Sequence, residues 1–154
     1  SGDMLKIVLL GVPNQPGVAA QIFKALSDFS VFIDMIIQSE GREDYKDLAF
    51  VVSREDEDKV KKAINSLEKE LPFLGMKFDE TMSRVSLVGA GIASNPNIAY
   101  RMFNALAQAG INIDMISTSN SRISCLIPRD LMGEAVKVLH EEFIIQEVKL
   151  NEGI

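Results

Sequence analysis

The chain has 154 residues, 47% of them hydrophobic, which is enough to bury a substantial core or two smaller ones. Its formal charge of -6 at pH 7 opposes contact with phosphate backbones, so nucleic acid is not an expected partner. No apolar run reaches the roughly 18 to 20 residues that a membrane-spanning helix needs, and the polar start does not look like a signal peptide. The sequence therefore predicts a cytoplasmic protein with no nucleic-acid and no membrane partner.

The first copy of an internal repeat has the order strand, helix, strand, strand, helix, strand. The apolar run 5–10 predicts a buried strand that Gly11 and Pro13 close with turn chemistry. Pro16 then opens a helix, because its fixed φ suits the first helical turn and apolar residues follow at three- and four-residue spacing. The remaining expected elements are strands over 31–39 and 47–53 around the polar hairpin loop EGREDYK, a helix over 56–71 and a closing strand over 76–79.

The second copy begins 80 residues later and repeats this order with a shorter hairpin loop. Identical residues at this offset include Gly11, Pro16, Phe23, Leu26 and the run IDMI at 33–36, which return as Gly91, Pro96, Phe103, Leu106 and 113–116. The expected elements are strands over 84–88, 111–118, 121–127 and 145–150 and helices over 96–109 and 131–143. Two copies of one module, over residues 4–80 and 81–154, are the economical interpretation.

The element order of each copy predicts the fold class. A βαββαβ unit is expected to be an α+β, ferredoxin-like module, with an antiparallel sheet and both helices on one face. The other face of each sheet then needs cover. Pairing of modules, within the chain or across a dimer, is the simplest cover.

Catalytic and metal-binding residues are scarce. His140 is the only histidine, and His140-Glu141-Glu142 lacks the second histidine that a zinc helix places four residues on. Cys125 stands alone in the apolar stretch ISCLI, which favours a small buried hydrophobe over a nucleophile. The sequence therefore predicts no cofactor and no metal.

The segment from Gly89 to Ser94, GAGIAS, keeps a nucleotide-binding alternative open. It follows a strand, precedes a helix and has Asp114 some twenty residues on, as a dinucleotide-binding fingerprint would. Against this, Ser94 replaces the third glycine and the next strand runs into a hairpin instead of a second crossover helix. A dinucleotide-dependent enzyme or nucleotide-binding fragment is the alternative function.

The strand-to-helix loop of each copy is the more informative pattern. These loops are Pro13-Asn14-Gln15-Pro16-Gly17 and Ala93-Ser94-Asn95-Pro96-Asn97. A turn that leaves backbone N–H groups free at a helix N-terminus can hold a small anion such as a carboxylate. The same residues equally fit a turn that only starts a helix, and spacing alone does not decide between the two.

Two blocks of sequence resemble the tandem ACT domains at the C-terminal end of aspartokinases. They are NQPGVAAQIFKALS with FIDMIIQ, and VSLVGAGIASNPNIAYRMFNALAQAGINIDMISTSNSRIS, which together extend over nearly the whole chain. The second block is the more specific, because SLVGAG, the Ser-x-Pro loop and ISTS followed by RIS are close to the pattern of that family.

The resemblance implies a function in the biosynthesis of lysine, threonine and methionine. ACT modules of two chains are expected to pack into a homodimer, and an end-product amino acid, L-threonine and/or L-lysine, to bind between facing modules and inhibit aspartate phosphorylation. The nucleotide-binding region of the kinase has no counterpart in this sequence. The chain is therefore expected to regulate an aspartokinase catalytic domain or alpha subunit and not to be an enzyme by itself.

The resemblance also implies which residues contact the effector. Gly17 and Ala19 would hold its carboxylate and backbone, Gln38 would reach its polar groups, and Asn112 and Ile113 would complete the pocket from the facing module. The full set of expected effector-binding residues is Asn14, Gln15, Pro16, Gly17, Val18, Ala19, Gln38, Asn95, Ile98, Asn112, Ile113 and Ser119.

The two copies are not equivalent at these positions. Phe32 stands in the first copy where the second has Asn112, and Thr118 stands in the second where the first has Gln38. Asn14 replaces an aspartate that is common in the family, and Asn97 replaces a glycine that lets a ligand approach. One of the two kinds of pocket is therefore expected to be weak or empty.

Overall fold

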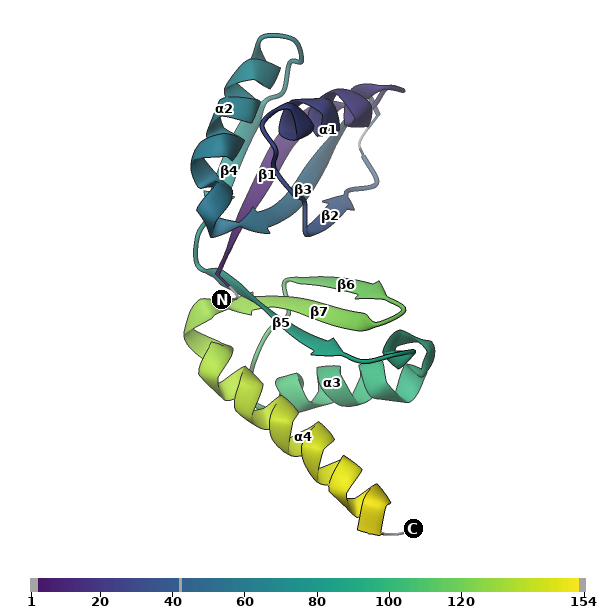
Figure 1. Ribbon diagram of the computed structural model, residues 1–154. Helices are drawn as coiled ribbons and strands as arrows, with labels where there is room; N and C mark the ends of the chain where they lie inside the picture. Colours follow the sequence, from purple (N-terminus) through teal and green to yellow (C-terminus); the bar gives the residue numbers. More distant parts are fainter. Residues whose placement is uncertain (1–2, 42, 153–154) are drawn as a thin grey trace. The chain divides into compact units, whose positions relative to one another are not determined.

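The computed structural model describes residues 3–41 and 43–152, with the backbone alone at residue 93 and from residue 144 onward. These residues form two compact units, of which the first runs over Asp3–Glu80 and the second begins at Thr81 (Figure 1). We call them the first and the second module. None of the described helices is long and apolar enough to cross a membrane.

The first module is a four-stranded antiparallel sheet with two helices on one face (Figure 1). Its elements are β1 (Met4–Pro13), α1 (Val18–Asp28), β2 (Met35–Gln38), β3 (Tyr45–Ser53), α2 (Glu57–Glu68) and β4 (Gly75–Asp79). The strand order is β2-β3-β1-β4, and every neighbouring pair is antiparallel. This confirms the predicted ferredoxin-like α+β fold.

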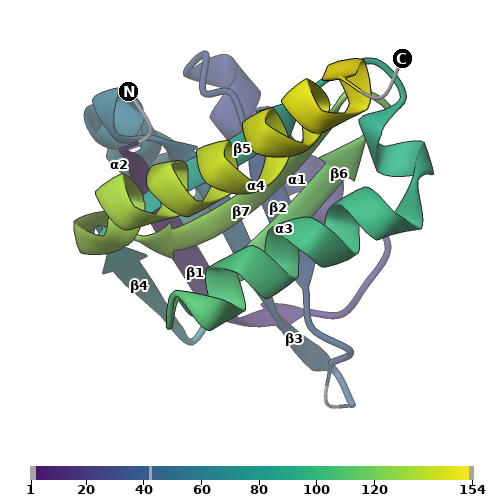
Figure 2. The ribbon, with the colours of Figure 1, turned by 90° about the horizontal axis from the view of Figure 1, so that it is seen from below.

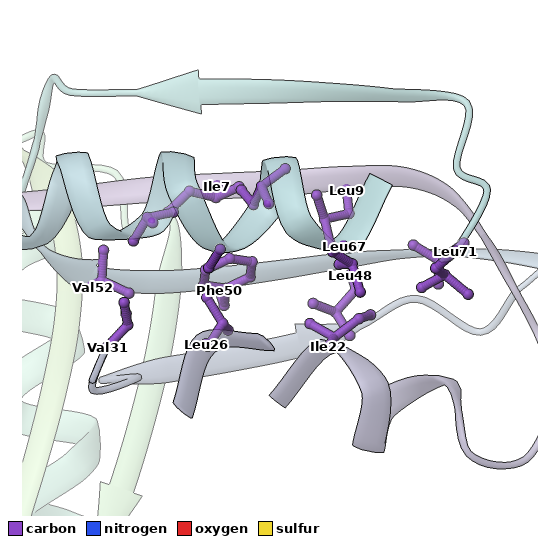
Figure 3. Packing of buried hydrophobic residues seen from close by; sticks show 14 of the residues in the cluster. Ile7, Leu9, Ile22, Leu26, Val31, Leu48, Phe50, Val52, Leu67 and Leu71 are labelled. Carbon is purple, nitrogen blue, oxygen red and sulfur yellow. The ribbon is translucent and has the colours of Figure 1, made fainter. Parts of the chain in front are cut away.

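The core of the first module lies between this sheet and its two helices. Helix α1 turns Val18, Ile22 and Leu26 inward at the expected spacing. Phe50 of β3 is fully buried, and Figure 3 shows Leu26 lying beside it while Ile22 lies beside Leu48. The apolar positions identified in the sequence thus form the face on which α1 and the sheet pack.

The strand predicted over 31–39 is shorter than expected, and the reason recurs in the second module. Residues 31–34 are not strand, because the amide of Val31 donates to the carbonyl of Leu26 (3.0 Å) and closes the end of α1. The amide of Ile111 likewise donates to the carbonyl of Leu106 (3.0 Å). The apolar residues after each helix therefore belong first to a helix C-terminus, and each strand begins four residues later.

A bulge in β1 depends on glycine at position 11. The register of β1 against β3 shifts between Leu9 and Val12, and Gly11 there has a φ of 63°. A Cβ atom at this position would lie 2.5 Å from Cδ1 of Leu74. Both the backbone conformation and the approach of Leu74 therefore require a residue without a side chain.

We predict that Gly11→Ala destabilises the protein by roughly 1 to 2 kcal/mol, because alanine is strained in the left-handed region and must also displace Leu74. Gly133→Ala is the matched control, since a Cβ there meets no atom within 4 Å and the residue lies in a helix. The control is expected to be neutral or to stabilise by up to about 1 kcal/mol. Urea unfolding of the two variants measures both effects, and equal changes would contradict the prediction.

The second module repeats the arrangement with three paired strands among the described residues. Its elements are β5 (Met82–Val88), α3 (Pro96–Gln108), β6 (Met115–Ser119), β7 (Arg122–Pro128) and α4 (Met132–Glu152). The order is β5-β7-β6 with both pairs antiparallel, and α3 and α4 lie over one face of this sheet (Figure 2).

The strand predicted over 145–150 is wrong, because helix α4 continues to Glu152. In the first module, α2 ends at Glu68, Pro72 then prevents the helix from resuming, and Gly75 begins β4. No proline or glycine stands between Gly133 and Glu152, and the residues there include the helix formers Gln146, Glu147 and Lys149. Nothing in that stretch interrupts the helix.

Candidate functional site

The loop between β1 and α1 leaves the N-terminus of α1 open. Gly17 is the N-cap residue, with a φ of 88° that favours glycine, and no side chain caps the helix. The first helical bond runs from the amide of Gln21 to the carbonyl of Gly17 (3.0 Å), so the amides of Ala19 and Ala20 have no acceptor within the helix. Because the helix dipole favours negative charge at this end, the loop can accept a carboxylate.

Hydrogen bonds hold this loop beside the hairpin between β2 and β3. The amide of Asn14 donates to the carbonyl of Asp44 (2.7 Å), and the amide of Gly11 donates to Oδ1 of Asp47 (3.0 Å). The amide of Asp47 donates in turn to Oγ of Ser39 (2.9 Å). Hydrogen bonds to the sheet and its hairpin therefore hold the start of the exposed loop Asn14 to Gly17 in position.

The register of the sheet places Gln38 on the face that α1 covers. Gln38 is the last residue of the edge strand β2 and pairs with Leu48 of β3. Partners in an antiparallel ladder project to the same face, and Leu48 packs in the core with Ile22 of α1. The structure thus puts Gln38 and helix α1 on one side of the sheet, with Gln38 exposed at the strand end.

The corresponding loop of the second module is capped by its own side chains. Oδ1 of Asn95 accepts a hydrogen bond from the amide of Asn97 (3.0 Å), and Pro96 occupies the first helical turn. Oγ of Ser94 donates to the carbonyl of Gly91 (2.6 Å). One of the amides that an anion would need is therefore already bound, which is the main difference between the two modules at this position.

The other expected contacts of the second module divide into exposed and packed residues. Asn112 and Ser119 are exposed, just before β6 and at its end. Ile98 and Ile113 are half-buried against the core of their own module. Thr118 pairs with the buried Ile123, so it occupies the same register position on the helix face as Gln38 does in the first module.

The geometry disfavours the dinucleotide-binding alternative. A dinucleotide fold needs neighbouring parallel strands at its glycine-rich turn, whereas among the described strands β5 pairs with the antiparallel β7 alone. A 3-10 turn over Ile92–Ser94 separates the glycines from α3, and Asn95 caps that helix.

The acidic residues that flank the first loop are not apparent from the sequence. A hollow of about 560 Å³ lies between the start of α1 and the turn after α2, and Gln15, Val18, Asp44 and Glu70 are among its lining residues. Asp44 belongs to the hairpin loop and Glu70 to the turn after α2, so they line one hollow only through the fold. No local pattern in the sequence signals this approach.

Cys125 is buried in the second core, and burial raises the pKa of its thiol to about 11. At pH 8 the thiolate is then only about one part in a thousand. We therefore predict that iodoacetamide alkylates Cys125 slowly in the native protein and fast in urea. Mass spectrometry measures the extent of alkylation over time. Because the unfolded chain releases this proton at lower pH, stability should also fall as pH rises from about 9 towards 11. Rapid native labelling would contradict this assignment.

The fold and the two loops match a known class of regulatory module. Models described as ACT domain match residues 6–70 and residues 85–143, one in each module. The chain is thus a pair of tandem ACT domains.

Comparison with known proteins shows which ACT-domain proteins this chain is similar to. An aspartokinase of Mycolicibacterium smegmatis is 40% identical over 140 residues, which cover 90% of this chain and 33% of that protein. The ligand-free regulatory subunit of aspartate kinase from Thermus thermophilus superposes with a TM-score of 0.86 at 35% identity, covering 93% of this chain and 94% of that one. A structure of aspartokinase alpha and beta subunits gives a TM-score of 0.81 at 37% identity, covering 92% of this chain and 93% of that one.

The chain therefore belongs to the aspartokinase family, and it corresponds to the regulatory part of that enzyme. It spans about a third of the length of the curated relatives that it matches.

Proposed function

We propose that the chain binds an end-product amino acid, L-threonine and/or L-lysine, and mediates feedback inhibition of aspartate phosphorylation. The observation that carries the proposal is the open N-terminus of α1 at Gly17, on a module whose sheet register puts Gln38 on the same face as α1. The family to which the chain belongs supports it, because aspartokinase phosphorylates aspartate at the head of the biosynthesis of these amino acids.

In this proposal, the effector carboxylate binds the amides at Gly17 and Ala19, within the loop formed by Asn14, Gln15, Pro16 and Val18. Gln38 contacts the polar groups of the effector. Asn112, Ile113 and Ser119 complete the pocket from a facing second module over 81–154, and Asn95 and Ile98 form the opposite kind of pocket. Because Asn95 already caps α3, we expect the pocket at α1 to be the stronger one.

The proposed assembly is a cytoplasmic homodimer that regulates an aspartokinase catalytic domain or alpha subunit. The similarity to a structure of aspartokinase alpha and beta subunits supports such a partner. Paired modules would cover the sheet faces that the helices leave open. Sedimentation at micromolar concentration should therefore give a dimer, and a monomer with and without effector would count against it.

A thermal-shift screen tests the proposed ligand class. A ligand at 100 times its dissociation constant adds about 2.7 kcal/mol to the stability of the folded state. L-threonine or L-lysine should raise the unfolding temperature, and NAD and ATP should not. Stabilisation by NAD or ATP alone would favour the nucleotide-binding alternative, and no response to any of the four would indicate a purely structural module.

A further inference from the structure

Two hollows on the first module share part of their lining, including the exposed side chains of Tyr45 and Leu74, which we call the ridge. Each hollow has a volume of about 560 Å³, and Gly11, Tyr45 and Leu74 line both. We call the lining of the two hollows the Tyr45–Leu74 surface. It extends from the hairpin between β2 and β3, across the end of β1, to the start of α1.

The ridge is apolar and exposed, and the backbone of Leu74 is held in place. Leu74 is 81% exposed and Tyr45 is 51% exposed, although both belong to a well-packed module. The amide of Leu74 donates to the carbonyl of Leu10 (2.8 Å), and its side chain lies over Gly11, where a Cβ atom would collide with it. Because the backbone at Leu74 is already held, its apolar side chain can be buried by a partner without ordering that backbone, so the ridge is suited to a partner.

Acidic residues dominate the surroundings of the ridge. Glu40 and Asp47 line one hollow with Lys46, and Asp44 and Glu70 line the other. Among the described residues that line the two hollows, four carboxylates thus face one ammonium group. A second copy of this chain, with its own charge of -6, is repelled by such a surface, whereas a segment that carries lysine or arginine is attracted.

We propose that the Tyr45–Leu74 surface docks a basic segment with an apolar side chain, contributed by the catalytic part of the aspartokinase. The chain spans only about a third of its relatives, so most of such an enzyme lies outside it and can supply the segment. Gln15 and Val18, at the proposed effector loop, line the same hollow as Asp44 and Glu70. The docked segment therefore contacts the loop that holds the effector, and this contact carries the effector signal to the catalytic part. The inference rests on the proposed function.

The test uses the assembled aspartokinase that contains this chain, with Leu74→Ser and Asp44→Lys/Glu70→Lys as variants. Both should keep the basal activity without effector. At saturating threonine or lysine both should retain nearly full activity, whereas the parent is inhibited. Calorimetric affinity for the effector should change less than threefold in Leu74→Ser, which alters no charge beside the effector loop. Val136→Ser is the matched control, since Val136 is 51% exposed on the other module, and it should be inhibited like the parent.

The outcomes separate the two proposals. Effector binding with unchanged inhibition in both variants would overturn the docking surface and leave the effector site standing. Absence of effector binding in the parent would instead reject the proposed function. Loss of inhibition in the Val136→Ser control as well would also overturn the docking surface, because the effect would not be specific to it. Low salt should strengthen the attraction between the acidic surface and a basic segment, because fewer ions screen the charges. The parent should therefore need less effector for half-inhibition at low salt than at high salt, and the Asp44→Lys/Glu70→Lys variant should not.

Discussion

Replacing Gln38 by alanine is expected to weaken effector binding by roughly tenfold to over a hundredfold. Its amide is proposed to hydrogen-bond a charged amino or carboxylate group of the effector, and such a bond contributes about 1.5 to 3 kcal/mol. Gln38 lies at the exposed end of β2 and pairs with Leu48, so truncation leaves the core intact. Calorimetric titration of threonine and lysine into the parent and the Gln38→Ala variant measures the loss.

Thr118→Ala is the matched control for this variant. Thr118 occupies the corresponding register position in the second module, where it pairs with Ile123. In that module the N-terminus of α3 is capped by Asn95. A merely structural role predicts similar small effects at both positions, whereas the proposed pocket predicts a large loss of affinity only at Gln38. Equal affinities in the parent and both variants would mean that the pocket lies elsewhere.

The largest loss of stability is expected for Phe50→Ala. Phe50 is fully buried in the first core, next to Leu26 of α1 (Figure 3), and removing its ring leaves a cavity that the surrounding helices cannot fill. Substitutions of this kind cost about 3 to 5 kcal/mol. Native-state hydrogen exchange measures this loss, because it reports on each module separately. The amides of β1 and β3 should exchange faster in the variant than in the parent.

Cys125→Ala gives the matched control in the second module. Phe50 pairs with Ile36 and Cys125 pairs with Ile116, so the two residues hold equivalent places in the repeated sheet. Cys125 is also fully buried but much smaller, and its truncation should cost only about 1 kcal/mol. An equal change in the exchange of both modules after Phe50→Ala would contradict the assignment of two separate cores.

The helices and the central strands were predictable because their signals are local. Pro96 begins α3 as predicted, whereas α1 begins at Val18 after its N-cap Gly17, so Pro16 precedes that helix and does not occupy its first turn. The spacing of Ile22 and Leu26 gives the buried face of α1. Because the two copies share one pattern, an element predicted in one copy is also expected at the equivalent place in the other. The strand over 145–150 was mispredicted from this symmetry, since the second copy lacks the proline and glycine that follow α2 in the first.

The candidate site was predictable only where it is local. The loop at Gly17 could be found from proline and glycine spacing, but its open state and the capping of the second loop by Asn95 depend on side-chain geometry. The approach of Asp44 and Glu70 to that loop depends on how the hairpin and the end of α2 fold back. Such approaches between distant segments leave no pattern in a single sequence.

A crystal structure of the chain grown with threonine and lysine tests the central claim most directly. Effector density is predicted at the N-terminus of α1, with its carboxylate on the amides at Gly17 and Ala19 and its polar groups within hydrogen-bond distance of Gln38. Occupancy at α3 beside Asn95 should be weaker or absent. Density only at α3, or no density at either loop at saturating concentrations of both amino acids, would contradict the account.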